Sequence, residues 1–128
     1  MTYYFSRQLT APFEEARART IAALKAEGFG IISEIDVKRT LEEKIGAPFR
    51  DYRILGACNP KLALEALELE DKIGTMLPCN VVVQARGKGT VEVAAIDPVA
   101  SMQAVDNPRL KQAAGAVGEK LKRAIEAL

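Results

Sequence analysis

The sequence has no histidine and no tryptophan, and it has only two cysteines among 128 residues. Histidine is the side chain that most often acts as general base, metal ligand or pH switch in proteins. Its absence excludes histidine-based catalysis and histidine-based metal sites. Two cysteines are also too few for a disulfide framework, and we expect both to be thiols in a reducing compartment.

An excess of one charge and long apolar runs are missing as well. Lysine and arginine number 18 against 17 aspartates and glutamates, giving a formal net charge of +1, and the two signs are mixed along the chain. Nucleic acids and anionic membranes attract strongly basic surfaces, so we expect neither as a partner. The longest apolar runs, such as Val81-Val82-Val83, fall far short of the ~20 residues of a membrane-spanning helix. Residues 1–7 do not resemble a secretory signal, which favours a cytoplasmic protein.

What the sequence does contain is ordinary globular composition, with 48% hydrophobic and 27% charged residues. A chain of this composition has enough apolar side chains to form a hydrophobic core. Its length fits one domain, and we therefore expect residues 1–128 to form a single domain.

Hydrophobic periodicity predicts five strands and four helices. Alternating apolar residues indicate strands at residues 3–9, 29–36, 52–57, 80–86 and 90–96, the last two joined by a turn at residues 87–89. Apolar residues three or four apart predict one long helix over residues 12–27 and another from residue 108 to the end. Short helices are expected at residues 40–45 and 61–69, because Asn59-Pro60 is typical of a helix start and Gly46 of a helix end.

This order of elements does not alternate strictly between strands and helices, which argues against a parallel doubly wound fold. We therefore predict an α+β protein with one curved, mostly antiparallel, five-stranded sheet and the two long helices on one face. Glu34 and Asp36 are expected on the other face, which is then only partly covered and open to a ligand or partner. A half-covered face or a free edge strand favours pairing with a second copy, so we expect a homodimer.

The candidate functional site is built on two Cys-Asn pairs, at residues 58–59 and 79–80. The first pair ends the third predicted strand and the second begins the fourth, so both pairs reach one end of the sheet if these strands are antiparallel neighbours. A carboxylate also ends the strand before and the strand after, and strand order decides whether these carboxylates lie at the same end. The candidate site residues are Asp36, Cys58, Asn59, Cys79, Asn80 and Asp97.

Four readings of these residues are open. Cysteine is often a small apolar core residue and Asn59 is a helix cap, so the pairs could be purely structural. A small-ligand site would use the amides and Asp36, with a wall supplied by apolar neighbours. A redox or thiol-dependent site would use both cysteines, although no C-x-x-C motif is present and no stable disulfide is expected. A metal site would use Cys58, Cys79 and Asp36, although the spacing does not match zinc motifs. The apolar wall is expected from Leu55, Met76, Leu77 and Ile96.

Several segments together resemble the domain-of-unknown-function family DUF302, over nearly the whole chain. The segments that carry the resemblance are Gly28-Phe29, Ile35-Asp36-Val37, Leu41 with Lys44, Ile54-Leu55-Gly56-Ala57-Cys58-Asn59-Pro60, Leu77-Pro78-Cys79-Asn80-Val81 and Asp97-Pro98. The resemblance implies a curved antiparallel sheet like that of TATA-box-binding proteins, in a strand, helix, four-strand, helix order. It implies no activity, because the function of the family is not established.

These observations lead to an uncharacterised cytoplasmic binding or accessory domain that takes a small molecule at the two Cys-Asn segments. A thiol-dependent redox protein or enzyme and a metal-binding domain are the alternatives. No nucleotide-binding or nucleophile motif is present, so no cofactor is identified and an enzyme is not favoured.

Overall fold

The computed structural model describes residues 2–128 and has an α+β fold built on one five-stranded antiparallel sheet. The strands lie side by side in the order β1-β5-β4-β3-β2, and every neighbouring pair is antiparallel. The predicted fold class is therefore confirmed. The strands are β1 (Tyr4–Thr10), β2 (Gly30–Asp36), β3 (Tyr52–Cys58), β4 (Cys79–Gly87) and β5 (Thr90–Ile96).

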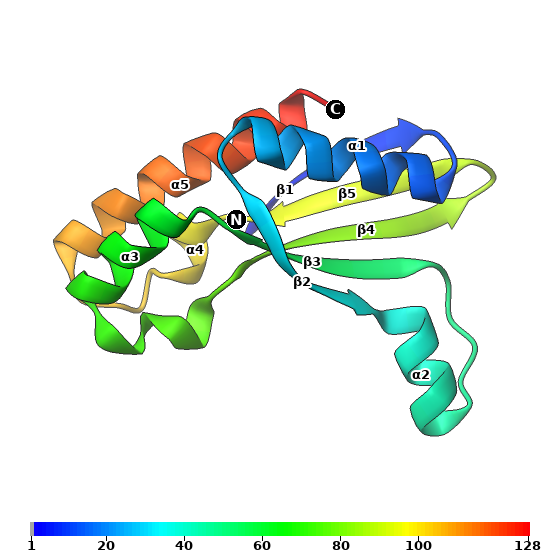
Figure 1. Ribbon diagram of the computed structural model, residues 1–128, viewed down its shortest axis with the longest axis horizontal. Helices are drawn as coiled ribbons and strands as arrows, with labels where there is room; N and C mark the ends of the chain where they lie inside the picture. Colours follow the sequence, from blue (N-terminus) through cyan, green and yellow to red (C-terminus); the bar gives the residue numbers. More distant parts are fainter. Residues whose placement is uncertain (1) are drawn as a thin grey trace.

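The two long helices cover one face of this sheet, as expected (Figure 1). Shorter helices lie at its two ends, and α2 projects away from the rest of the molecule. The helices are α1 (Phe13–Ala26), α2 (Val37–Ile45), α3 (Pro60–Leu69), the 3-10 helix η1 (Asp71–Met76), α4 (Pro98–Ser101) and α5 (Pro108–Glu126). Among the described residues, no helix is both long enough and apolar enough to cross a bilayer.

The main hydrophobic core lies between the sheet and the two long helices. Alternate residues of each strand enter it, such as Val81 and Val83 of β4, while Leu24 of α1 and Leu121 of α5 enter from the helices. All four side chains are at most 1% exposed. At roughly 25 cal/mol per Å² of buried apolar surface, this alternation is the main source of the fold's stability.

A smaller second cluster lies beyond the end of the sheet where β3 ends and β4 begins. It joins α3, η1, α4 and the first turns of α5, and it contains Ile73, Met102 and Leu110. The sequence did not predict α4, because a four-residue helix carries no periodic signal, nor did it identify η1 as a helix. Both elements matter for function, since they enclose the space described below.

A bulge in β2 makes one expectation wrong. Ile31 pairs with Ala57 and Ser33 pairs with Gly56, so one residue of β2 is skipped between them. An extra residue reverses which face the following side chains occupy. Glu34 and Asp36 therefore lie on the face covered by the helices, and Ser33 and Ile35 lie on the open face. The open face remains, but these carboxylates are not on it.

Helix α2 also begins three residues earlier than expected. The carboxylate of Asp36 accepts a hydrogen bond from the backbone N–H of Arg39 at 3.0 Å, so the last residue of β2 is at once the N-cap of α2. Gly46 ends the helix in a left-handed conformation with φ 64°, as the sequence predicted. No residue of α2 is buried.

Candidate functional site

The structure brings the two cysteines together at one end of the sheet. Strands β3 and β4 are antiparallel neighbours, and Ala57 pairs directly with Cys79, so Cys58 and Cys79 are diagonal neighbours. Strand β5 ends here too, because Ala95 pairs with Val81, and Asp97 follows it. Asp36 pairs with Arg53 at the opposite end of β3. Five residues of strand, about 17 Å, separate Arg53 from Cys58.

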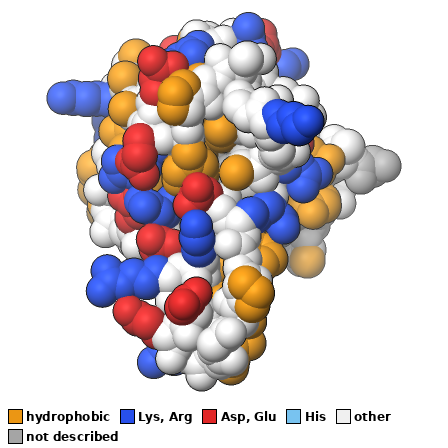
Figure 2. Space-filling model, turned by 90° about the vertical axis from the view of Figure 1, so that its right-hand side faces the viewer, with side chains coloured by type: hydrophobic (Ala, Val, Ile, Leu, Met, Phe, Trp, Pro, Cys, Tyr) orange, Lys and Arg blue, Asp and Glu red, His pale blue; other side chains and the backbone are white. Residues whose placement is uncertain are grey.

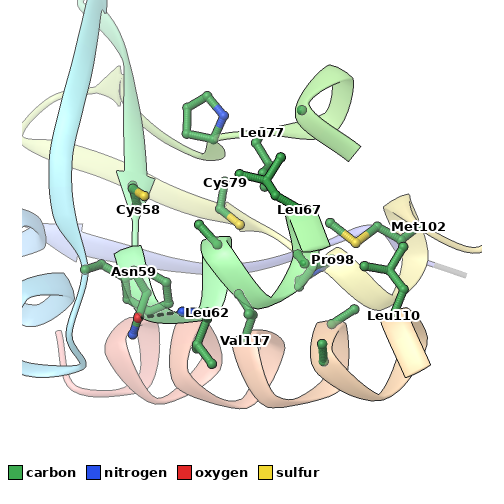
Figure 3. Close-up of a pocket in the computed structure, with 18 of the residues that line it drawn as sticks. Cys58, Asn59, Leu62, Leu67, Leu77, Cys79, Pro98, Met102, Leu110 and Val117 are labelled. Carbon is green, nitrogen blue, oxygen red and sulfur yellow. Dashed lines mark hydrogen bonds between the residues drawn. The ribbon is translucent and has the colours of Figure 1, made fainter. Parts of the chain in front are cut away.

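A pocket with a volume of about 330 Å³ opens at the end that carries the cysteines. Its walls come from the ends of β3 and β4, from α3 and η1, and from α4 and α5 (Figure 3). Figure 3 shows Cys58 and Cys79 beside the same space, with Leu62 and Val117 on the helices across from them. The pocket also borders Phe29 and Ala57 of the main core and Met102 and Leu110 of the second cluster. It therefore lies at the seam between the two hydrophobic clusters.

None of the pocket-lining residues is charged, and apart from the two thiols its one polar side chain is that of Asn59. The amide of Asn59 is already engaged, because its Oδ1 accepts a hydrogen bond from the N–H of Leu62 at 3.2 Å and caps α3. Within residues 2–128, no buried side-chain nitrogen or oxygen lacks a hydrogen-bond partner. The pocket thus offers contact surface and two thiols rather than a set of directional polar groups.

Gly28 holds the Asn59 side chain against the end of α1. Gly28 has φ 90°, a left-handed conformation that favours glycine, and a Cβ atom there would lie 2.9 Å from Nδ2 of Asn59. A side chain at position 28 would therefore be strained and would displace the amide. The glycine that ends α1 and the asparagine that starts α3 are packed as a pair at the rim of the pocket.

The two thiols have different surroundings, and neither is in a disulfide. Cys79 is 7% exposed and Cys58 is half-buried. Burial, together with the nearby Cys58, raises the pKa of the Cys79 thiol to about 11. A reactive cysteine needs a lowered pKa, since the thiolate is the nucleophile. At neutral pH Cys79 is therefore a protonated, weakly polar part of the wall and a poor nucleophile.

Three of the residues predicted for the site are helix caps. Besides Asn59 and Asp36, Asp97 accepts a hydrogen bond from the N–H of Val99 at 3.0 Å and starts α4. Asp97 lies next to the pocket residue Pro98 but does not itself line the pocket. Asn80 lies on the open face, where it lines a separate hollow. Of the six residues, Cys58, Asn59 and Cys79 line the pocket, and Asp97 lies at its edge.

The expected apolar wall is only partly right. Leu77 lines the pocket, whereas Leu55 is in the main core, and Ile96 borders the hollow on the open face. Met76 is not part of the wall. The larger part of the wall comes from helices, where an apolar stripe looks the same whether it contacts a core or a cavity. These helical wall residues are Leu62, Ala63, Ala66, Leu67, Met102, Leu110, Ala113, Ala114 and Val117.

The opposite end of β3 carries an ion-pair network. Arg53 lies 2.7 Å from Glu34 and 3.4 Å from Asp36, and Arg17 of α1 binds both oxygens of Glu34 at 2.6 Å. Hydrogen bonds from Arg17 and then from Arg53 lower the pKa of Glu34 to about 2. Figure 2 shows acidic and basic side chains intermingled at this end of the molecule. The network ties α1 to β2 and β3 and explains why charged residues lie under a helix.

The described part of the chain contains no group of three or more cysteine or acidic side chains placed to hold a metal ion. The set considered from sequence, Cys58 and Cys79 with Asp36, is not assembled, because Asp36 is at the far end of the sheet and bound to Arg53. Two thiols remain, and one of them is buried with a raised pKa.

Comparisons with known proteins agree with the fold. The family model described as "Domain of unknown function DUF302" matches residues 5–128. A solved structure described as an uncharacterized conserved protein DUF302 from Bacillus stearothermophilus is similar, with a TM-score of 0.90 and 26% sequence identity over 98% of each chain. No curated protein matches.

A five-stranded antiparallel sheet with α1 and α5 on one face and a pocket at its end is thus the architecture of an established family whose function is unknown. The chain belongs to the DUF302 family.

Proposed function

We propose that the protein binds a small, uncharged, mainly apolar molecule in the pocket at the end of β3 and β4. The observation that carries the proposal is the pocket itself, about 330 Å³ of apolar space that the chain's own side chains do not fill. Protein interiors contain few voids larger than a water molecule. Small-ligand pockets are mostly apolar and begin at about this size.

The energetic cost of such a space supports this reading. A closed, empty void of this volume would cost roughly 8 kcal/mol at about 24 cal/mol per Å³, which is comparable to the whole stability of a domain. The surrounding side chains are small where they could have been large, since Ala63, Ala66, Ala113 and Ala114 all border the space. A larger residue at one of these positions would close it. An apolar ligand would recover part of the lost contact energy.

The lining also limits the chemistry of the ligand. A charged group buried in this pocket would have no opposite charge to pair with, and the desolvation of an unpaired ion costs several kcal/mol. The apolar part of the ligand therefore enters the pocket, and any charged group stays outside. A smaller engineered cavity of ~150 Å³ holds benzene, so this pocket accommodates a ligand of roughly ten to fifteen non-hydrogen atoms.

The test is a fluorescence titration with N-phenylnaphthylamine, an uncharged apolar dye that becomes fluorescent when it leaves water. We expect saturable binding to the wild-type protein. Anilinonaphthalene sulfonate has nearly the same body with a negative charge, and it should bind at least about tenfold more weakly, a difference of ~1.4 kcal/mol. Equal affinity for the two dyes would contradict an uncharged site.

A pair of variants on α5 separates the pocket from the rest of the surface. Ala113→Phe places a large side chain where Ala113 lines the pocket, and it should abolish dye binding while the protein remains folded. Ala116→Phe adds the same side chain at an exposed position of the same helix and should leave binding unchanged. Loss of binding in both variants, or in neither, would place the dye elsewhere.

The proposed setting is the cytoplasm, where the protein acts as a homodimeric binding or accessory domain. Two free cysteines, one of them half-buried at the pocket, fit a reducing compartment. The pocket supplies no general acid or base, and the raised pKa of Cys79 disfavours thiol catalysis there. Binding is thus the function that the geometry supports best.

A further inference from the structure

The sheet face opposite α1 and α5 is not covered by any long helix (Figure 1). Residues that pair directly across the strands form a row through its middle, which is apolar except at the β1 edge. Ala94 pairs with Val82, and Val82 pairs with Ile54. The row extends to Ile35 on β2, which is 47% exposed, and to Ser6 on β1. An apolar strip therefore crosses four of the five strands.

The rows on either side of this strip are polar or aromatic, and their charges are already compensated. In one row Glu92 accepts a hydrogen bond from Gln84 at 3.2 Å and lies 3.5 Å from Arg86. Tyr52 continues that row, and Tyr4 belongs to the row on the other side. Apolar centres, polar margins and an excess of tyrosine and arginine over lysine are typical of protein interfaces. Covering this face would not bury an uncompensated charge.

Helix α2 is the second unexplained feature of the same region. Val37, Leu41 and Ile45 recur every four residues and form an apolar stripe, yet none is buried and Ile45 is 73% exposed. A nine-residue helix is marginal in isolation and normally depends on packing of its apolar face. Figure 2 shows hydrophobic side chains along one side of this protruding part at the bottom of the view. The monomer does not provide a surface that covers the stripe.

The area of this region matches what a stable complex needs. Five strands, four of seven residues and one of nine, with ~4.8 Å between strands and ~3.4 Å per residue, give a flat face of roughly 550 Å². The exposed side of α2, ~13 Å long and ~10 Å wide, brings the total to roughly 700 Å² per copy. Stable interfaces bury about 800 Å² per partner, and lattice contacts are mostly below 800 Å² in total.

We propose that this open face, together with the apolar stripe of α2, is the interface with a second copy of the chain. The apolar row runs through the middle of the sheet, so a two-fold axis near Val82 places row against row. Two twisted sheets pack in this way with their faces about 10 Å apart. In this arrangement α2 of each copy lies along the edge of the partner's sheet and covers its own stripe.

The oligomeric state tests the proposal. Light scattering after size exclusion, at high micromolar concentration, should give twice the chain mass of 13.9 kDa for the wild-type protein. Ala94→Arg places a charge in the centre of the open face and should give the chain mass with an unchanged circular dichroism spectrum. Ala116→Arg makes the same change on the exposed side of α5 and should remain dimeric. Ile45→Glu should raise the dissociation constant at least about tenfold, because the stripe of α2 then carries a charge.

A wild-type monomer at that concentration would overturn the proposal, and so would a dimer that survives Ala94→Arg. Dissociation caused by Ala116→Arg would move the interface to the helices. If Ala94→Arg does not fold, Ile35→Glu is the substitute, since Ile35 is on the same row and already half exposed. The dye titration reports on the other face of the sheet, so it can fail while this proposal stands.

Discussion

The two ends of β3 on the helix side of the sheet have solved the same problem differently. At one end Arg53 meets three carboxylates, and Arg17 of α1 completes a network in which every charge has a partner. At the other end Cys58 borders a pocket that the chain leaves unfilled. The first end is complete without a ligand, and the second is not. The comparison identifies the charged end as structural and the apolar end as the place for a ligand, although charge is usually the more conspicuous sign of a site.

The largest effect is expected from shortening leucines near the two ends. Leu55 shares a face of β3 with Arg53, and Leu110 borders the pocket; both are 0% exposed. Leu55→Ala should lower the free energy of unfolding by about 4–5 kcal/mol, because it leaves a closed cavity. Leu110→Ala should cost only about 2–3 kcal/mol, because the new space joins one that is already open. Urea unfolding measures both values, and equal losses would mean that the pocket is no looser than the core.

A large kinetic effect is expected at Cys79. Its raised pKa, about 11 against an ordinary value of 9.0, lowers the thiolate fraction at neutral pH by about a hundredfold. Alkylation of Cys79 by iodoacetamide in the folded protein should therefore be at least that much slower than in urea. Peptide mass mapping of a Cys58→Ser variant follows Cys79 alone. Alkylation of the folded variant at the unfolded rate would reopen the thiol-dependent alternative.

The charged end should show a pH-dependent effect of intermediate size. The pKa of Glu34 is about 2 in the folded protein, below its ordinary value of 4.5, so its contribution to stability is present above pH 4.5 and is lost as the pH falls toward 2. Because the side chain is 25% exposed, we reduce that contribution to about 1–2 kcal/mol. Glu34→Gln should be destabilised by this amount at pH 7, and the difference from wild type should shrink by more than half at pH 3. A difference that is constant with pH would contradict the network.

The smallest effect is expected at the helix cap beside the pocket. Asn59→Ala removes the acceptor for the N–H of Leu62 and should cost about 1 kcal/mol of unfolding free energy. Asn59→Asp keeps the acceptor and should cost less. Both variants should still bind N-phenylnaphthylamine, since the amide contributes the cap rather than the apolar wall. Loss of dye binding in the stable Asn59→Asp variant would give the amide a direct role in recognition.

Most of the fold follows from the sequence, because periodicity and caps are local. The five strands and two long helices were predicted within a few residues, and Asn59-Pro60 and Asn107-Pro108 start helices as expected. The face of β2 was wrong, since the bulge between Ile31 and Ser33 has no glycine or proline to mark it. One extra residue was enough to move Glu34 and Asp36 to the opposite face.

The candidate site was predictable only where it depends on neighbouring strands. The meeting of Cys58 and Cys79 follows from two antiparallel strands joined through α3, and the pairing of Ala57 with Cys79 agrees with it. The separation of Asp36 depends on strand order, which no local pattern fixes. The pocket depends on the distance between two hydrophobic clusters, and residues such as Leu110 and Val117 have the pattern of ordinary core positions.

The most direct test of the account is to observe where an apolar ligand binds. Methyl NMR spectra of the labelled protein, recorded while N-phenylnaphthylamine is added, report on leucine, valine and isoleucine positions across the molecule. The account predicts that the methyl signals of Leu62, Leu110 and Val117 shift with the dye concentration, while Ile35 and Val82 on the open face do not. Shifts confined to Ile35 and Val82, with Leu110 and Val117 unchanged, would contradict it.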